Sequence, residues 1–238
     1  GRSFLIRPDQ QGIAVLNDDG TPLRWEREFG SIITTAAASQ SLSAWGLLDG
    51  KLFLLDREGL ILRIIDPRQE GINSAHPCVY ALAMSGQGQS IALLYGISPQ
   101  YVLVYERKSG FYSLSYSKAL QGDLRSTQSA AFSRDGRDLL VKTADGLVYF
   151  DRDSGKGALL HPDRFAGKGE LLIKAFENDG FALLKAEGSG RYAGLIRHGA
   201  LEAYFPLPAE SFGLTASEDS FIVRAKEKDL VFTRRGDE

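Results

Sequence analysis

The chain has 238 residues, of which 43% are apolar and 24% are charged, a balance typical of a folded globular protein rather than a disordered one. Its formal charge of −2 offers no basic surface of the kind that binds nucleic acid, and no stretch approaches the roughly 18 apolar residues that a membrane-spanning helix needs. Cys78 is the only cysteine, so no intrachain disulfide can form and the redox compartment stays open.

A short sequence motif recurs six times along the chain. In each copy an apolar strand is followed by a polar turn that ends in glycine. The copies are 12–20, 51–59, 101–110, 147–155, 191–199 and 229–236. Their closing glycines lie 37 to 51 residues apart. A period of about 40 residues built from hairpins is typical of a β-propeller.

A second hairpin lies between successive copies and is clearest at 126–142, around the turn Ser133-Arg-Asp-Gly136. Asp-Gly between two apolar strands is a strong hairpin signal, because glycine accepts the positive φ that the turn demands. Equivalent hairpins are predicted at 32–48, 79–95, 171–186 and 212–224. A full unit is therefore four short antiparallel strands, the pattern of one propeller blade. We predict an all-β fold, a β-propeller of four-stranded antiparallel blades that forms a single domain over 1–238, with six blades and five as the alternative.

The two ends are predicted to be incomplete units. Residues 3–7 and 12–15 resemble 220–224 and 229–232, so each end carries a second and a third strand. The first unit lacks an obvious first strand, and the last stops after its third. These strands do not complement one another, so either the ring closes irregularly or strands are missing from it.

Two segments resemble known propeller repeats. The turn Phe132-Ser-Arg-Asp-Gly136 is similar to the turn common in WD40 and related bacterial propellers, and 143–156 is similar to the repeat of pyrroloquinoline-quinone-type propellers. The Trp-Asp dipeptide of WD40 repeats, the regular tryptophans of the quinoprotein enzymes and their acidic calcium cluster have no counterpart in the sequence. The resemblance therefore implies a non-catalytic member that acts as an interaction platform, without cofactor or metal.

Tyrosines concentrate in one unit, where Tyr101 and Tyr105 are predicted to share one face of a strand and Tyr112 and Tyr116 one face of the next. Tyrosine supplies rigid amphipathic area at interfaces, which suits a docking patch for a partner protein. The rings would equally fill the outer gap between blades with their hydroxyls in water, and this second interpretation is favoured.

His76 and His161 lie in connections between one unit's last strand and the next unit's first. Such connections share one face of a propeller, so the two histidines could line the same channel mouth. Each precedes a proline, which itself favours an extended or turn geometry, and no third ligand lies at a spacing suited to a metal. Residues 66–76, which include Arg68, form the longest connection, and loops on a rigid scaffold often carry recognition.

These observations predict a non-catalytic protein-interaction scaffold with a protein partner, as part of a cell-envelope assembly. The alternative is a binder of small molecules or carbohydrates, or a hydrolase or lyase, at the channel mouth. The chain begins Gly1-Arg-Ser3 rather than with methionine, which indicates a processed or trimmed start with a signal or anchor upstream. We accordingly expect a periplasmic or other extracytoplasmic location; an engineered boundary and a cytoplasmic location are the alternatives.

Overall fold

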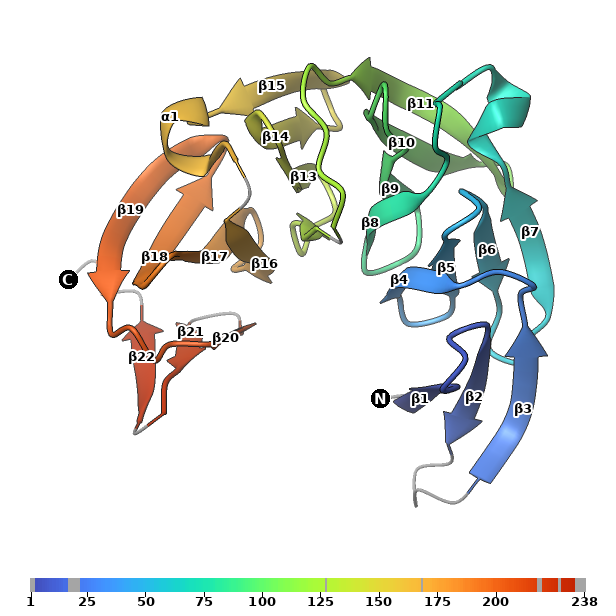
Figure 1. Ribbon diagram of the computed structural model, residues 1–238, viewed down its shortest axis with the longest axis horizontal. Coiled ribbons are helices and arrows are strands. Elements are labelled where there is room, and N and C mark those ends of the chain that lie inside the picture. The colour runs from blue at the N-terminus through green and yellow to red at the C-terminus, as the bar shows by residue number, and fades with distance from the viewer. Residues whose placement is uncertain are drawn as a thin grey trace.

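The computed structural model describes residues 3–16, 22–126, 128–167, 169–217, 220–226 and 228–233. These residues form six antiparallel sheets, which Figure 1 shows as blades arranged around a common axis. Helical structure within them is limited to a 3-10 turn, η1 (Pro67–Glu70), and a single α-helical turn, α1 (Pro162–Phe165). Neither of these turns, nor any other part of the described chain, forms a helix long and apolar enough to cross a membrane.

Four of the blades contain four strands in chain order from the axis outward, and the two terminal blades contain three (Figure 1). Blade 1 consists of β1 (Ser3–Ile6), β2 (Gly12–Leu16) and β3 (Pro22–Glu28), and blade 2 of β4 (Ile33–Ala38), β5 (Ser43–Leu47), β6 (Leu52–Leu55) and β7 (Ile61–Ile65). Blade 3 consists of β8 (Val79–Met84), β9 (Ser90–Tyr95), β10 (Tyr101–Lys108) and β11 (Phe111–Ala119). Blade 4 consists of β12 (Ala130–Phe132), β13 (Asp138–Thr143), β14 (Gly146–Asp151) and β15 (Lys156–Leu160). Blade 5 consists of β16 (Glu170–Phe176), β17 (Gly180–Glu187), β18 (Gly190–Arg197) and β19 (Ala200–Leu207), and blade 6 of β20 (Gly213–Ala216), β21 (Ser220–Arg224) and β22 (Asp229–Thr233).

The hydrophobic core lies between the blades, with one cluster of buried side chains at each of the five junctions. Successive side chains of a strand point to opposite faces of its sheet, so a blade with neighbours on both sides buries both sets. All residues of the second strands β5, β9 and β13 are accordingly buried. This explains why the middle strands are continuous apolar runs rather than alternating ones.

A serine at the end of the first strand shapes the first hairpin in four of the blades. Its hydroxyl accepts a hydrogen bond from a backbone N–H at or just before the next strand, and the four residues are Ser39, Ser85, Ser133 and Ser217. Side chains of this kind satisfy turn N–H groups that no strand can reach. In blade 5 the turn instead holds Glu177 at a positive φ of 53°.

The predicted hairpins at 32–48, 79–95, 126–142, 171–186 and 212–224 are all confirmed. Parts of the turns predicted within 12–20, 217–219 and 229–236 lie outside the described residues. The six-blade count and the antiparallel propeller architecture are likewise confirmed.

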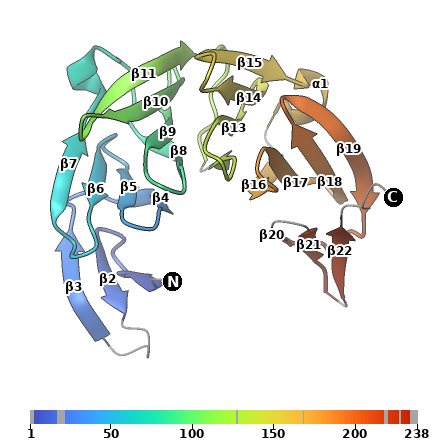
Figure 2. The same cartoon turned by 180° about the vertical axis from the view of Figure 1, so that it is seen from behind.

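The six blades form an arc in which blade 1 and blade 6 lie at opposite ends, as both views show (Figures 1 and 2). Within the described residues, β1 pairs with β2 alone and β22 pairs with β21 alone. As far as the chain is described, blade 1 therefore has no counterpart of the inner strand of blades 2 to 5, and blade 6 none of their outer strand. This is the mismatch expected from the sequence, and strand pairing between these two sheets does not close the arc.

Candidate interaction surfaces

The four tyrosines of blade 3 are divided between two junctions. Tyr105 and Tyr112 are buried between blades 2 and 3, and the half-buried Tyr101 packs against the same cluster. Tyr116 packs on the opposite face of the blade, where its ring centroid lies 4.6 Å from that of Phe150 of blade 4. The prediction that Tyr112 and Tyr116 share a face is therefore wrong.

A β-bulge in β11 causes this division. Val104 lies opposite Tyr116 and Tyr105 opposite Leu114, which leaves Ser115 as an extra residue. Its hydroxyl donates to Val104 O at 3.0 Å. One extra residue reverses the side-chain alternation beyond it, so Tyr116 points to the face opposite Tyr112.

The burial of Tyr105 and Tyr112 corrects the interpretation of the tyrosines as a patch. Tyr105 has no exposed surface, and Tyr112 donates its hydroxyl to Gly88 O within the blade. Burial raises the pKa of both, so both stay neutral. The rings do fill the space between blades, although these two hydroxyls do not lie in water; a partner role for Tyr101 and Tyr116 stays a prediction.

The connection that contains Arg68 is an ordered segment. Asp66 Oδ1 accepts hydrogen bonds from Arg68 N at 3.1 Å and from Arg68 Nε at 2.8 Å. Asp66 Oδ2 accepts one from Arg68 Nη2 at 2.7 Å. These bonds hold the pKa of Asp66 below its usual value. Ile72 packs on the core of the same junction as Tyr105. The structure thus brings the Arg68 segment to the tyrosine-rich blade, with the guanidinium engaged by Asp66.

His76 and His161 lie in connections that are separated by blades 3 and 4. His76 is exposed between β7 and β8. His161 lies between β15 and α1 at a φ of +44°, with its ring edge-on to Phe165. Within the described ranges, no group of three or more His, Cys, Asp or Glu side chains is placed to hold a metal. A shared channel mouth for the two histidines stays a prediction.

A row of exposed apolar side chains lies along the outer strand β7 and the residue before it, and it is not among the sites predicted from the sequence. Leu60, Ile61, Leu62 and Ile64 are 60%, 43%, 54% and 47% exposed. Among the described strands β7 pairs with β6 alone, so the other edge of β7 presents N–H and C=O groups that no described strand pairs with. The run Leu60-Ile-Leu-Arg-Ile-Ile65 in an outermost position was the available signal.

The other complete blades have more polar outer strands. β11 exposes three serines at alternate positions, Ser113, Ser115 and Ser117. β15 exposes Lys156, Ala158 and Leu159, and β19 exposes Ala200, Glu202 and Pro206. Charges, proline and small polar residues protect a free strand edge from pairing. The apolar surface of β7 is therefore a property of blade 2 and not of the repeat.

Two hollows lie beside the loops that connect the blades. A cavity of about 510 Å³ lies between blades 3 and 4 and is lined by Lys118, Gln121, Asp145, Leu159 and Ala166 among others. A second, of about 450 Å³, lies between the first strands of blades 4 and 5. Its polar lining consists of Ser126, Gln128, Ser129 and Glu170. Hydroxyl, amide and carboxylate groups of this kind can bind a polar small molecule.

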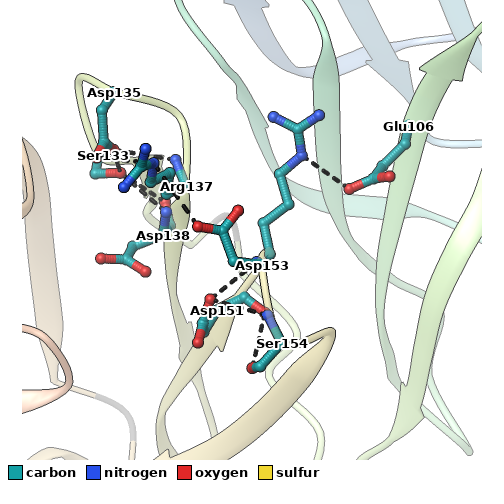
Figure 3. Close-up of polar contacts among 9 residues, drawn as sticks. Glu106, Ser133, Asp135, Arg137, Asp138, Asp151, Asp153 and Ser154 are labelled. Atoms are coloured by element: carbon teal, nitrogen blue, oxygen red, sulfur yellow. Dashed lines mark hydrogen bonds and ion pairs between the residues drawn. The ribbon is translucent and has the colours of Figure 1, made fainter.

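A charged cluster joins blades 3 and 4 at the opposite ends of the strands (Figure 3). Arg152 Nε donates to Glu106 Oε1 at 3.0 Å across the junction. Arg137 lies within 3.9 Å of Asp135 and 3.7 Å of Asp153. Asp151 accepts from Ser154 and Asp153 in its own turn, which lowers its pKa. These carboxylates are thus engaged in holding turns and blades together.

Comparison with known proteins agrees with this architecture. The sequence model of a family described as a beta-propeller protein matches residues 1–166. No curated protein matches the chain.

Several solved structures are similar in fold. Sqt1 from Chaetomium thermophilum, bound to the N-terminus of ribosomal protein L10, is 14% identical with a TM-score of 0.66, over 97% of this chain and 70% of that one. KlAtg21 in complex with the coiled coil of AgAtg16 is 14% identical with a TM-score of 0.67, over 96% and 74%. BamB from Moraxella catarrhalis is 16% identical with a TM-score of 0.58, over 94% and 64%. At these identities the likeness shows the fold alone, whereas the family match covers well over half of the sequence. The chain belongs to the beta-propeller protein family.

Proposed function

We propose that the protein is a non-catalytic interaction scaffold that binds a partner protein through the outer rim of blade 2. The observation that carries this proposal is the exposed apolar surface of β7 beside an unpaired strand edge. Two structures of similar fold, Sqt1 and KlAtg21, are complexes with protein segments, which supports the same use of a propeller.

Contact of the apolar β7 side chains with water is unfavourable in free energy, and a partner that covers them removes this contact. Each half-exposed leucine or isoleucine of β7 would gain roughly 1 kcal/mol on full burial. Contiguous exposed apolar side chains on a soluble protein mark interaction sites more often than isolated ones do. The free edge adds backbone donors and acceptors that an extended partner segment can pair with.

The test compares two double variants of outer strands. Leu62→Lys with Ile64→Lys places charges on β7, and Ser113→Lys with Ser117→Lys places them at two exposed positions of the outer strand β11 as a control. Partners crosslinked to the wild type in a lysate of the source cells are identified by mass spectrometry, purified and titrated against all three proteins. We expect affinity to fall at least about tenfold for the β7 variant, the factor that corresponds to about 1.4 kcal/mol, and less than twofold for the control.

Equal binding by the two variants, or no partner in any capture, would overturn the proposal. Circular dichroism of both variants checks that the propeller remains folded. The cell-envelope location stays a prediction, which fractionation of the source cells checks.

A second candidate function is the binding of a polar small molecule such as a carbohydrate. The cavity between blades 4 and 5, with its hydroxyl, amide and carboxylate lining, favours it. A rise in melting temperature with a sugar, lost in Gln128→Leu and retained in His76→Ala, would support this function. The absence of any such rise across a broad carbohydrate library would rule it out.

A further inference from the structure

The cavity between blades 3 and 4 takes no part in either function proposed above. Its volume of about 510 Å³ lies within the range of roughly 300–1,000 Å³ that is typical of small-molecule sites. Most of its lining residues are apolar, namely Ala119, Leu120, Ala144, Val148, Leu159 and Ala166. The others are Lys118, Gln121 and Asp145. An apolar hollow with a few polar groups is the usual composition of a ligand site.

The cavity lies where the junction between the two blades is no longer filled by aromatic rings. Further along the junction Tyr116 packs on Phe150, with ring centroids 4.6 Å apart. Lys118 follows two residues later on β11 and therefore points to the same face of blade 3, toward blade 4. On blade 4, Val148 pairs with Leu159, which is 41% exposed. The cavity thus has a lysine on blade 3 and an apolar wall on blade 4.

The loop that walls the cavity on the side of blade 3 is held in place by Gln100. This side chain is fully buried, and its Nε2 donates to Gly96 O at 3.1 Å and to Leu124 O at 2.9 Å. Its Oε1 accepts from Leu124 N at 3.1 Å, and Leu120 N donates to Gln100 O at 2.8 Å. A wall that is already fixed loses little conformational entropy when a ligand binds. The cavity is therefore preformed.

The two charges of the lining differ in what they already contact. Asp145 Oδ2 accepts from Gln121 N at 3.2 Å and from Gly122 N at 3.4 Å. A Cβ atom on Gly122 would lie 3.0 Å from Asp145 Oδ1, so both carboxylate oxygens lie beside the backbone of this loop. The ammonium group of Lys118, by contrast, has no hydrogen bond or ion pair with any residue that the structure describes. The charge left for a ligand is therefore positive.

We propose that this cavity binds a small organic acid, with its carboxylate paired to Lys118 and its apolar body against Val148 and Leu159. An ammonium group and a carboxylate form a charge-assisted hydrogen bond, which is stronger than a bond between neutral groups. The apolar body gains free energy as it leaves water. The site is independent of the surface on β7 and of the cavity between blades 4 and 5, because it lies at another junction.

Calorimetric titration of the whole protein with octanoate tests the proposal. We expect one saturable site for octanoate and no measurable binding of acetate, which has the same charge without the apolar body. Hexanoate should bind about 15-fold more weakly than octanoate, since each buried CH₂ contributes about fourfold in affinity. The uncharged analogue 1-octanol should bind at least about tenfold more weakly, because it offers Lys118 no negative charge.

Three variants locate the ligand. Lys118→Met removes the charge from a stem of similar size, so octanoate affinity should fall at least about tenfold while 1-octanol affinity changes less than twofold. Ala166→Trp fills the cavity and should abolish binding of both. Lys156→Met removes an exposed lysine at the far end of β15 from Leu159, and it should match the wild type as the control.

The proposal fails if octanoate shows no saturable binding, or if its affinity is unchanged in Lys118→Met. Octanoate binding that persists in Ala166→Trp would place the ligand elsewhere and contradict the proposal as well. Circular dichroism checks that each variant is folded. Should Lys118→Met not fold, the wild type itself decides, since equal affinities for octanoate and 1-octanol would mean that no charge is recognised.

Discussion

The indole ring of Trp25 on β3 lies against the backbone of Gly59, in the turn that precedes β7. A Cβ atom on Gly59 would lie 2.3 Å from Trp25 Cδ2, and Trp25 Nε1 donates to Arg57 O at 3.2 Å. The junction between blades 1 and 2 therefore depends on a position without a side chain. The same turn positions the start of the apolar outer strand.

Substitution of Gly59 should be markedly more harmful than substitution of a glycine with a similar φ. Gly71 has a φ of +80° and Gly59 one of +77°, yet only Gly59 has a ring in the way. We expect Gly71→Ala to cost about 1 kcal/mol of folding free energy for its left-handed backbone, and Gly59→Ala about 1–3 kcal/mol more. Urea unfolding of both variants measures the difference, and equal losses would show that Trp25 moves aside freely.

The repeated turn serine predicts a graded effect across blades. Ser133 is buried, and its hydroxyl accepts from Asp138 N at 2.9 Å and donates to Asp135 Oδ1 at 2.6 Å. Ser133→Ala leaves Asp138 N without a partner and should cost roughly 1–3 kcal/mol. Ser217→Ala removes the equivalent bond at an exposed turn, where water replaces it, and should cost under about 1 kcal/mol. The two free energies of unfolding, compared in one buffer, provide the check.

The ion pair between Arg152 and Glu106 should couple blades 3 and 4 measurably. It is partly buried, whereas Arg137 and Asp153 are largely exposed at 3.7 Å (Figure 3). A double-mutant cycle with Arg152→Met and Glu106→Gln should give a coupling of roughly 0.5–1 kcal/mol.

The corresponding cycle with Arg137→Met and Asp153→Asn is the control, and its coupling should be close to zero. Raising the salt concentration should reduce the first coupling only in part, since buried charges are screened less. Equal couplings in the two cycles would contradict this account.

Lys142 on β13 is buried, and its titration makes the free energy of unfolding depend on pH. Its pKa is about 8 in the folded protein, against an ordinary value of 10.5. Between these values the unfolded chain binds more protons than the folded one, so this group makes the free energy of unfolding rise with pH. Below pH 8 its contribution is constant and unfavourable. The stability of the wild type relative to Lys142→Arg should accordingly rise from pH 8 toward 10, which urea unfolding at each pH measures; a flat difference would contradict it.

The hairpins could be predicted because their signals are local. At Ser133-Arg-Asp-Gly136 the turn residues lie within four positions, and Gly136 has the positive φ of 75° that the sequence indicates. The incomplete terminal blades could be predicted from the sequence for the same reason, since each strand has its own apolar run. Blade order then follows from chain order.

The sites were less predictable because they depend on contacts between distant segments. The bulge at Ser115 is set by pairing with β10, and nothing in the local alternation of β11 reveals it. The exposure of Leu62 depends on β7 being outermost, and the same run would be buried in a middle strand. Lys142 is a charged residue in an apolar strand, and two of the three carbonyls that accept from its ammonium group, Phe165 O and Gly167 O, lie over 20 positions away.

The open arc of blades determines how the molecule comes apart. In a closed ring each blade is held by two junctions, whereas in the arc formed by the described residues blades 1 and 6 are each held by one (Figures 1 and 2). An array in which each unit contacts only its neighbours unfolds as a sum of unit and interface energies. When the chain of 238 residues is heated by itself, blades 1 and 6 should therefore melt first, with the tyrosine-rich third blade and its neighbour among the last.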